Sequence, residues 1–81
     1  MRPYRIQYAG GAEASRKAMT PEVRDGFEAA MAKTLGRDPY GHGSTSIRGD
    51  QDYREVTVAD CFVVYYVSAS VLTVTAVRIV H

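Results

Sequence analysis

The sequence has one cysteine, three prolines, no tryptophan and almost no excess of charge of either sign. A single thiol, Cys61, excludes an internal disulfide and a cysteine-based metal site, which is typical of a protein in a reducing cytosol. Ten Lys and Arg against nine Asp and Glu give a net charge of +1, so composition does not indicate a strongly basic nucleic-acid binder. No apolar run approaches the roughly 18 residues of a membrane span, and Met1 is not followed by the apolar core of a signal peptide. We therefore expect a cytoplasmic protein without a membrane segment.

The length of 81 residues is enough for one small domain. Of these residues, 46% are hydrophobic and 23% are charged. A chain of this length hides only about 60% of its unfolded surface on folding, so a deep cofactor crevice would remove much of its core. Phosphate-binding glycine motifs, nucleophile elbows and paired Cys/His spacings are missing from the sequence. We expect a single domain over residues 1–81, with no cofactor and no metal, whose function lies on a surface or in a shallow groove.

The first half of the chain predicts one strand and two helices. Apolar and polar residues alternate over residues 4–9, which is typical of a half-buried strand, and residues 12–19 favour a short helix. A second helix is expected after Thr20, because Thr20 and Pro21 combine an N-cap with a proline at the first helical position. We expect Gly36 to end this helix in the left-handed conformation. The apolar residues of this helix recur every four positions and form one core-facing stripe: Val23, Phe27, Met31 and Leu35.

The second half predicts a long loop and three strands. Residues 38–49 are rich in glycine and small polar residues and are expected to form a loop. Three runs rich in β-branched and aromatic residues follow at 53–58, 62–67 and 71–80. Their short links favour an antiparallel meander, and the apolar second and third runs belong at the centre of the sheet. The predicted fold is α+β with the order β-α-α-β-β-β, in which both helices pack on one face of a twisted four-stranded sheet.

Three stretches of the second half carry a resemblance to a known family. They are the loop RDPYGHGSTSIRG, the overlapping passage IRGDQDYREV, and FVVYYV followed by VLTVTAVRIVH. These stretches resemble the RelE/ParE superfamily of bacterial toxins from type II toxin–antitoxin systems. That family shows a Pro-aromatic loop, an apolar-basic-Gly corner, a Tyr-Arg/Lys strand and a final strand that ends near a basic residue. The resemblance covers nearly the whole chain and implies a cognate antitoxin as partner.

The RelE-like branch of this superfamily implies ribosome-dependent cleavage of mRNA. Such cleavage needs a base for the 2′-hydroxyl, cations for the charged phosphorane and an acid for the leaving 5′-oxygen. The resemblance makes Arg54 and Arg78 the candidate catalytic cations. It makes His81 the candidate proton carrier, since imidazole titrates near neutrality.

Three further residues are candidates for binding the RNA substrate. Arg48 lies in the corner before the sheet, and Tyr53 and Tyr65 are candidates for stacking on a base. Tyr65 and Tyr66 are expected on opposite faces of their strand, so that one is in the core and the other is exposed. For association with ribosomal RNA we expect clustered cations, with Arg48, Arg54 and Arg78 converging on one concave side of the sheet.

The sequence departs from the RelE-like pattern at catalytic positions, which leaves other functions open. Phe62 stands where RelE-like members usually have an arginine, and Val56 replaces a second cation. Thr45 stands where YoeB-like members carry a glutamate base. ParE-like members poison DNA gyrase by binding, and VRIVH resembles their closing strand. A third interpretation is a non-toxic interaction domain that binds an antitoxin.

Overall fold

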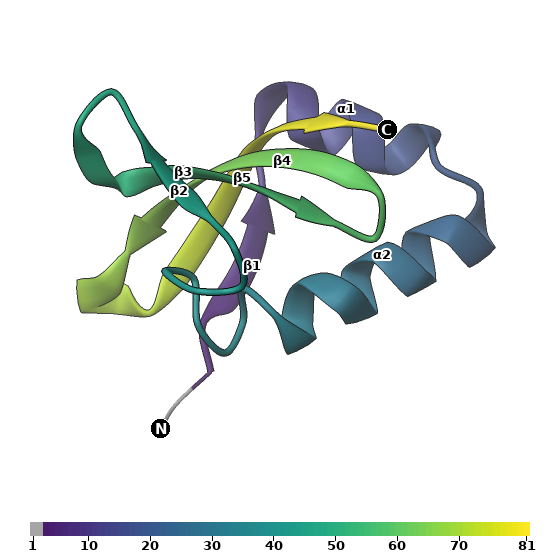
Figure 1. Cartoon of the computed structure of the whole chain (residues 1–81). Coiled ribbons are helices and arrows are strands. Elements are labelled where there is room, and N and C mark those ends of the chain that lie inside the picture. The colour runs from purple at the N-terminus through teal and green to yellow at the C-terminus, as the bar shows by residue number, and fades with distance from the viewer. Residues whose placement is uncertain (1–2) are drawn as a thin grey trace.

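A computed structural model describes residues 3–81, which form two α-helices and a five-stranded mixed sheet (Figure 1). The elements follow in the order β1 (Arg5–Tyr8), α1 (Gly10–Ala18), α2 (Pro21–Lys33), β2 (Thr45–Ile47), β3 (Asp50–Val58), β4 (Cys61–Ser68), a 3-10 turn at Ala69–Val71 and β5 (Thr73–Val80). The predicted α+β class and the succession of a strand, two helices and a meander are confirmed. The sheet has one strand more than predicted, because residues 45–47 of the expected loop pair with β3.

The strands lie in the order β1-β5-β4-β3-β2. The strands β3, β4 and β5 form the predicted antiparallel meander, and β1 returns beside β5 in parallel. The two most apolar strands, β4 and β5, are therefore each paired on both sides, as their sequences predict. The short strand β2 forms the other edge and makes a hairpin with β3 that projects at the upper left of Figure 1.

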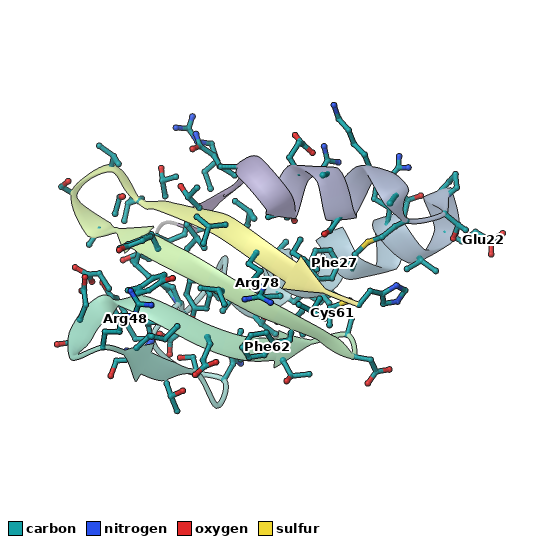
Figure 2. All side chains as sticks on the ribbon, turned by 90° about the horizontal axis from the view of Figure 1, so that it is seen from above. Glu22, Phe27, Arg48, Cys61, Phe62 and Arg78 are labelled. Carbon is teal, nitrogen blue, oxygen red and sulfur yellow. The ribbon has the colours of Figure 1, made fainter. Side chains whose placement is uncertain are left out.

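Both helices contribute to a single apolar core on one face of the sheet. The N-cap prediction is confirmed, since the Thr20 hydroxyl accepts a hydrogen bond from the Val23 amide at the start of α2. Phe27 lies between the helices and the sheet (Figure 2). Of the predicted stripe only Val23 stays out of the core, with 40% of its surface exposed. The largest apolar side chains that are fully buried in this core are Tyr65, Phe27, Met31, Leu35, Val63 and Val74.

Two of the three hairpins, β2–β3 and β3–β4, turn through two residues in the left-handed conformation. Ala59 and Asp60 (φ 50° and 65°) connect β3 to β4, and Arg48 and Gly49 (φ 56° and 73°) connect β2 to β3. Two consecutive left-handed residues give a turn whose twist matches that of the flanking strands. As a consequence, Arg48 lies exposed at the tip of a hairpin.

Gly36 differs from its prediction, because its backbone is not left-handed. The helix α2 ends instead through Thr34, and the Gly36 amide donates to the Met31 carbonyl at 2.9 Å. A Cβ atom on Gly36 would lie 2.4 Å from the carbonyl oxygen of Ala32. This position therefore needs glycine because the backbone packs closely there.

Replacing Gly36 by alanine is expected to lower the free energy of unfolding by about 1–3 kcal/mol, because the added methyl group overpacks against backbone that must shift. Gly26→Ala is the matched control, since a Cβ there meets nothing within 4 Å and Gly26 lies exposed inside α2. Helix propensity predicts that this control raises the free energy of unfolding by about 0.5–1 kcal/mol. Urea denaturation of the two variants measures both changes, and an equal effect of the two substitutions would contradict the packing argument.

Candidate functional site

The face of the sheet opposite the helices carries the candidate site. Because side chains alternate along a strand, every second residue of β3, β4 and β5 lies on this side. Phe62, Tyr66 and Val80 have 36%, 43% and 46% of their surface exposed there. We call this surface the open face, and its central residues are Tyr53, Glu55, Thr57, Phe62, Val64, Tyr66, Thr75, Arg78 and Val80.

A β-bulge brings Arg78 to the open face. Val64 pairs with Arg78 whereas the next residue, Tyr65, pairs with Ala76, so Val77 is an extra residue in β5. Strict alternation from the buried Ala76 would have turned Arg78 toward the core. The extra residue turns the Arg78 side chain to the opposite side of the sheet. Arg78 therefore lies exposed near the middle of the sheet (Figure 2).

The strand register arranges the open face in three rows. Tyr53 and Tyr66 pair across β3 and β4, and their rings stack with centroids 4.5 Å apart and an angle of 16° between the planes. The next row contains Glu55, the nearly buried Val64 and Arg78. The third row is Thr57, Phe62 and Val80. An aromatic platform therefore lies beside a row that has a carboxylate at one end and a guanidinium at the other.

Arg54, the first catalytic candidate, lies on the other face of the sheet. It pairs with the buried Tyr65, and only 9% of its own surface is exposed. Its Nε donates to the Ser44 hydroxyl at 3.1 Å and its Nη1 to the Gln51 carbonyl at 3.0 Å. Its Nη2 donates to the carbonyls of Tyr40 and Ser44 at 3.3 and 3.2 Å. This guanidinium holds the loop before β2 against the sheet, so the prediction that it shares a face with Arg78 is wrong.

Tyr65 is also part of this structural arrangement. Its ring is fully buried, and its hydroxyl donates to the carbonyl of Pro39. Burial raises the pKa of this hydroxyl. The expectation that Tyr65 and Tyr66 lie on opposite faces is confirmed, but the choice of Tyr65 for contact with substrate is wrong, because Tyr66 is the exposed member of the pair.

The remaining candidates lie at separate places. Arg48 is at the tip of the β2–β3 hairpin, at one end of the sheet, whereas Arg78 is near the middle (Figure 2). His81 follows the last residue of β5 and is exposed. Arg48, Arg54 and Arg78 thus do not converge, and the prediction of a shared concave cluster of guanidinium groups is wrong. Tyr53 and Arg78 are the two candidates that share the open face, and the role of His81 stays a prediction.

Glu55 is the residue of the open face that our sequence interpretation missed. Simple alternation along residues 53–58 could have found it, since Glu55 has the same parity as Tyr53, whereas Arg54 has the opposite parity. Arg78 could not be placed in this way, because its orientation depends on the bulge at Val77.

The Tyr40 hydroxyl has a hydrogen-bond partner that bears on the stability of the protein at alkaline pH. It donates to Asp52 Oδ1 at 2.7 Å, and this hydrogen bond, followed by burial, raises the pKa of Tyr40 from 10.0 to about 12. Burial, followed by the charge of Glu28, raises the pKa of Tyr8 to about 12 as well. Between pH 10 and 12 the unfolded chain therefore binds fewer protons than the folded one.

We expect the free energy of unfolding to fall as the pH rises from about 10 to 12, since the contribution of a raised tyrosine pKa is complete below pH 10. Urea denaturation at pH 9, 10 and 11 measures the slope. Tyr40→Phe should reduce the change of the free energy of unfolding with pH. An unchanged slope in this variant would show that groups other than Tyr40 cause it.

Comparison with known proteins identifies the fold. No protein-family model matches the sequence, and no curated protein matches it significantly. Solved structures do match. A chain of the RelBE2 toxin–antitoxin complex from Mycobacterium tuberculosis superimposes with a TM-score of 0.74 at 17% identity, covering 98% of each chain. A mutant of the RelE toxin from Escherichia coli in the free state gives 0.72 at 15% identity, over 95% of this chain and 81% of that one. The archaeal RelE–RelB complex from Pyrococcus horikoshii gives 0.68 at 13% identity, over 95% and 92%.

These superpositions define the class of fold: the chain has the fold of RelE toxins, and the resemblance found in the sequence is confirmed at this level. Within residues 3–81, no helix is long and apolar enough to cross a membrane. In the same part of the chain, no three His, Cys, Asp or Glu residues are grouped so that they could hold a metal ion.

Proposed function

We propose that this chain is the toxin of a type II toxin–antitoxin pair, and that it cleaves mRNA on ribosomes in the cytosol. The observation that carries the proposal is the stacked Tyr53–Tyr66 pair beside Arg78 on the open face of a RelE-type fold. Several of the matching structures are complexes of RelE toxins with antitoxins, which supports a cognate antitoxin as partner.

The open face offers the contacts that a single-stranded RNA needs. Exposed aromatic rings accept bases of any identity by stacking, at about 1–3 kcal/mol per base. Arg78 can donate two parallel hydrogen bonds from its planar guanidinium fork to the oxygens of a neighbouring phosphate. Recognition of this kind selects an unpaired strand more strongly than a particular sequence.

The low charge of the chain predicts weak binding to free RNA. The net charge is +1, and the guanidinium of Arg54 is hydrogen-bonded inside the protein rather than facing solvent. Binding to free RNA is dominated by contacts between cations and phosphates. We therefore expect weak affinity for free RNA, and efficient cleavage only where a ribosome presents the strand.

A second candidate function rests on the apolar part of the open face. Phe62 and Val80 are exposed beside Arg78, and Phe62 stands where the RelE-like pattern has a cation. An exposed apolar patch with one charge is typical of a protein interface. This patch favours, as the alternative, a toxin that acts by binding a protein such as DNA gyrase. Loss of supercoiling by purified gyrase, with accumulation of cleaved DNA, would support this alternative.

The proposed function is tested by mapping mRNA ends in a reconstituted translation reaction. We expect cuts within translated codons in the presence of ribosomes, and little cleavage of the same RNA alone. Tyr66→Ala should slow cutting by about 5- to 150-fold, the range that corresponds to 1–3 kcal/mol of lost stacking. Val71→Ala is the matched control, because Val71 is 65% exposed in the link between β4 and β5, outside the open face, and has no aromatic ring. Equal rates for wild type and Tyr66→Ala would exclude the tyrosine platform as the contact.

A further inference from the structure

We infer that Glu55 is the general base of the cleavage reaction, acting on the 2′-hydroxyl while Arg78 holds the adjacent phosphate. The inference rests on the proposed function and assigns the base that the sequence lacks at the position expected from the family. Its foundation is the row Glu55–Val64–Arg78, in which the two charged residues flank one apolar residue of the central strand β4.

The register places the two groups at the separation that a scissile linkage requires. Two strand spacings separate the backbones of Glu55 and Arg78, roughly 10 Å in all. Both side chains are long enough to reach toward one phosphodiester that lies above Val64. Val64 is 7% exposed, so neighbouring side chains cover this apolar residue between the two charges.

Neither Glu55 nor Arg78 forms a salt bridge within the described residues. Within residues 3–81, the salt bridges are those of Arg16 with Glu13 and Glu28, so Glu55 and Arg78 are bound neither to each other nor to another ion. The neighbours of Glu55 on this face carry no opposite charge: Thr45 on β2, Tyr53 and Thr57 on β3 and Val64 on β4. The carboxylate is thus available to a substrate proton.

The other acids of β3 are engaged elsewhere. Asp52 accepts the hydrogen bond of the Tyr40 hydroxyl, and Asp50 Oδ1 accepts one from the Asp52 amide at 2.9 Å. Glu55 therefore remains as the carboxylate of this strand that lies between the Tyr53–Tyr66 platform and the Phe62 row.

The chemistry balances without a further reactant. The Glu55 carboxylate takes the proton of the 2′-hydroxyl, and the 2′-oxygen forms a bond to phosphorus. Arg78 donates hydrogen bonds to the non-bridging oxygens as negative charge develops on them. The bond between phosphorus and the 5′-oxygen then breaks, and the leaving oxygen takes a proton from water. The products are a 2′,3′-cyclic phosphate and a 5′-hydroxyl end, and Glu55 returns its proton to solvent.

Glu55→Gln tests this role, because the amide keeps the shape of the side chain and cannot take the proton. Single-turnover cleavage of ribosome-bound mRNA should slow by about 10²- to 10⁴-fold, while the melting temperature and the binding to ribosomes stay unchanged. Glu22→Gln is the matched control, since it removes the same charge from an exposed position at the start of α2. It should cleave at the wild-type rate.

A substrate with sulfur in place of the bridging 5′-oxygen distinguishes whether Glu55 acts as a general base or as a general acid. This leaving group needs no protonation, so it would rescue a variant that has lost the acid but not one that has lost the base. We expect Glu55→Gln to remain slow on this substrate. Rescue, or a wild-type rate for Glu55→Gln on ordinary mRNA, would overturn the assignment of Glu55 while leaving the proposed function intact. If wild-type protein cuts no mRNA, the proposed function and the assignment fail together.

Discussion

Arg54→Met is expected to lower the free energy of unfolding by about 3 kcal/mol. The carbonyls of Tyr40, Ser44 and Gln51 lose charged donors that contribute about 1.5–3 kcal/mol each, and removal of the buried charge offsets part of this loss. In a chain of 81 residues this corresponds to a fall in melting temperature on the order of 15 °C. The stacking of the guanidinium over the Tyr40 ring, 5.5 Å from the centroid, is lost as well.

Arg37→Met is the matched control for this experiment. It makes the same substitution at an exposed residue of the same connection between α2 and β2, where we expect a change within about 0.5 kcal/mol. Thermal unfolding monitored by circular dichroism compares the two. At a temperature where Arg54→Met is folded, it should cleave mRNA at close to the wild-type rate. A variant that is stable yet inactive would instead make Arg54 a catalytic group.

Arg78→Ala is expected to slow cleavage of ribosome-bound mRNA by about 10²- to 10³-fold, since it removes the cation that lies on the open face next to the tyrosine platform. The melting temperature should change little, because Arg78 is exposed. Arg78→Lys should recover part of the rate, as the charge is kept and the planar fork is lost. Primer extension across the cut codons gives the rates. Cleavage by Arg78→Ala at the wild-type rate would exclude this residue from the reaction.

Most of the fold could be predicted from the sequence, because its signals are local. The Thr20 cap, the four-residue spacing of Phe27, Met31 and Leu35, and the short links between the last strands fix the helices and the meander. The strand β2 was missed because three residues carry too weak a pattern. The conformation of Gly36 was wrong because its requirement comes from the close approach of the Ala32 carbonyl, a contact that the pattern of helix ends does not contain.

The site was harder to predict, because it depends on which face each side chain occupies. Tyr53 and Arg54 were grouped by their adjacency in the sequence, although neighbouring residues on a strand point to opposite faces. The orientation of Arg78 depends on one extra residue at Val77, and the hydroxyl of the buried Tyr65 finds its acceptor in the carbonyl of Pro39, 26 residues away in the sequence. Neither tertiary feature leaves a signal in the residue pattern. The resemblance to RelE proteins predicted the fold correctly and the convergence of the arginines incorrectly.

The central claim is that the open face acts on mRNA, and mapping of mRNA ends in a reconstituted translation reaction tests it most directly. Wild-type protein should give new ends within translated codons, Arg78→Ala and Tyr66→Ala should give far fewer, and Arg37→Ala should match the wild type. Intact mRNA at saturating amounts of folded wild-type protein would contradict the account.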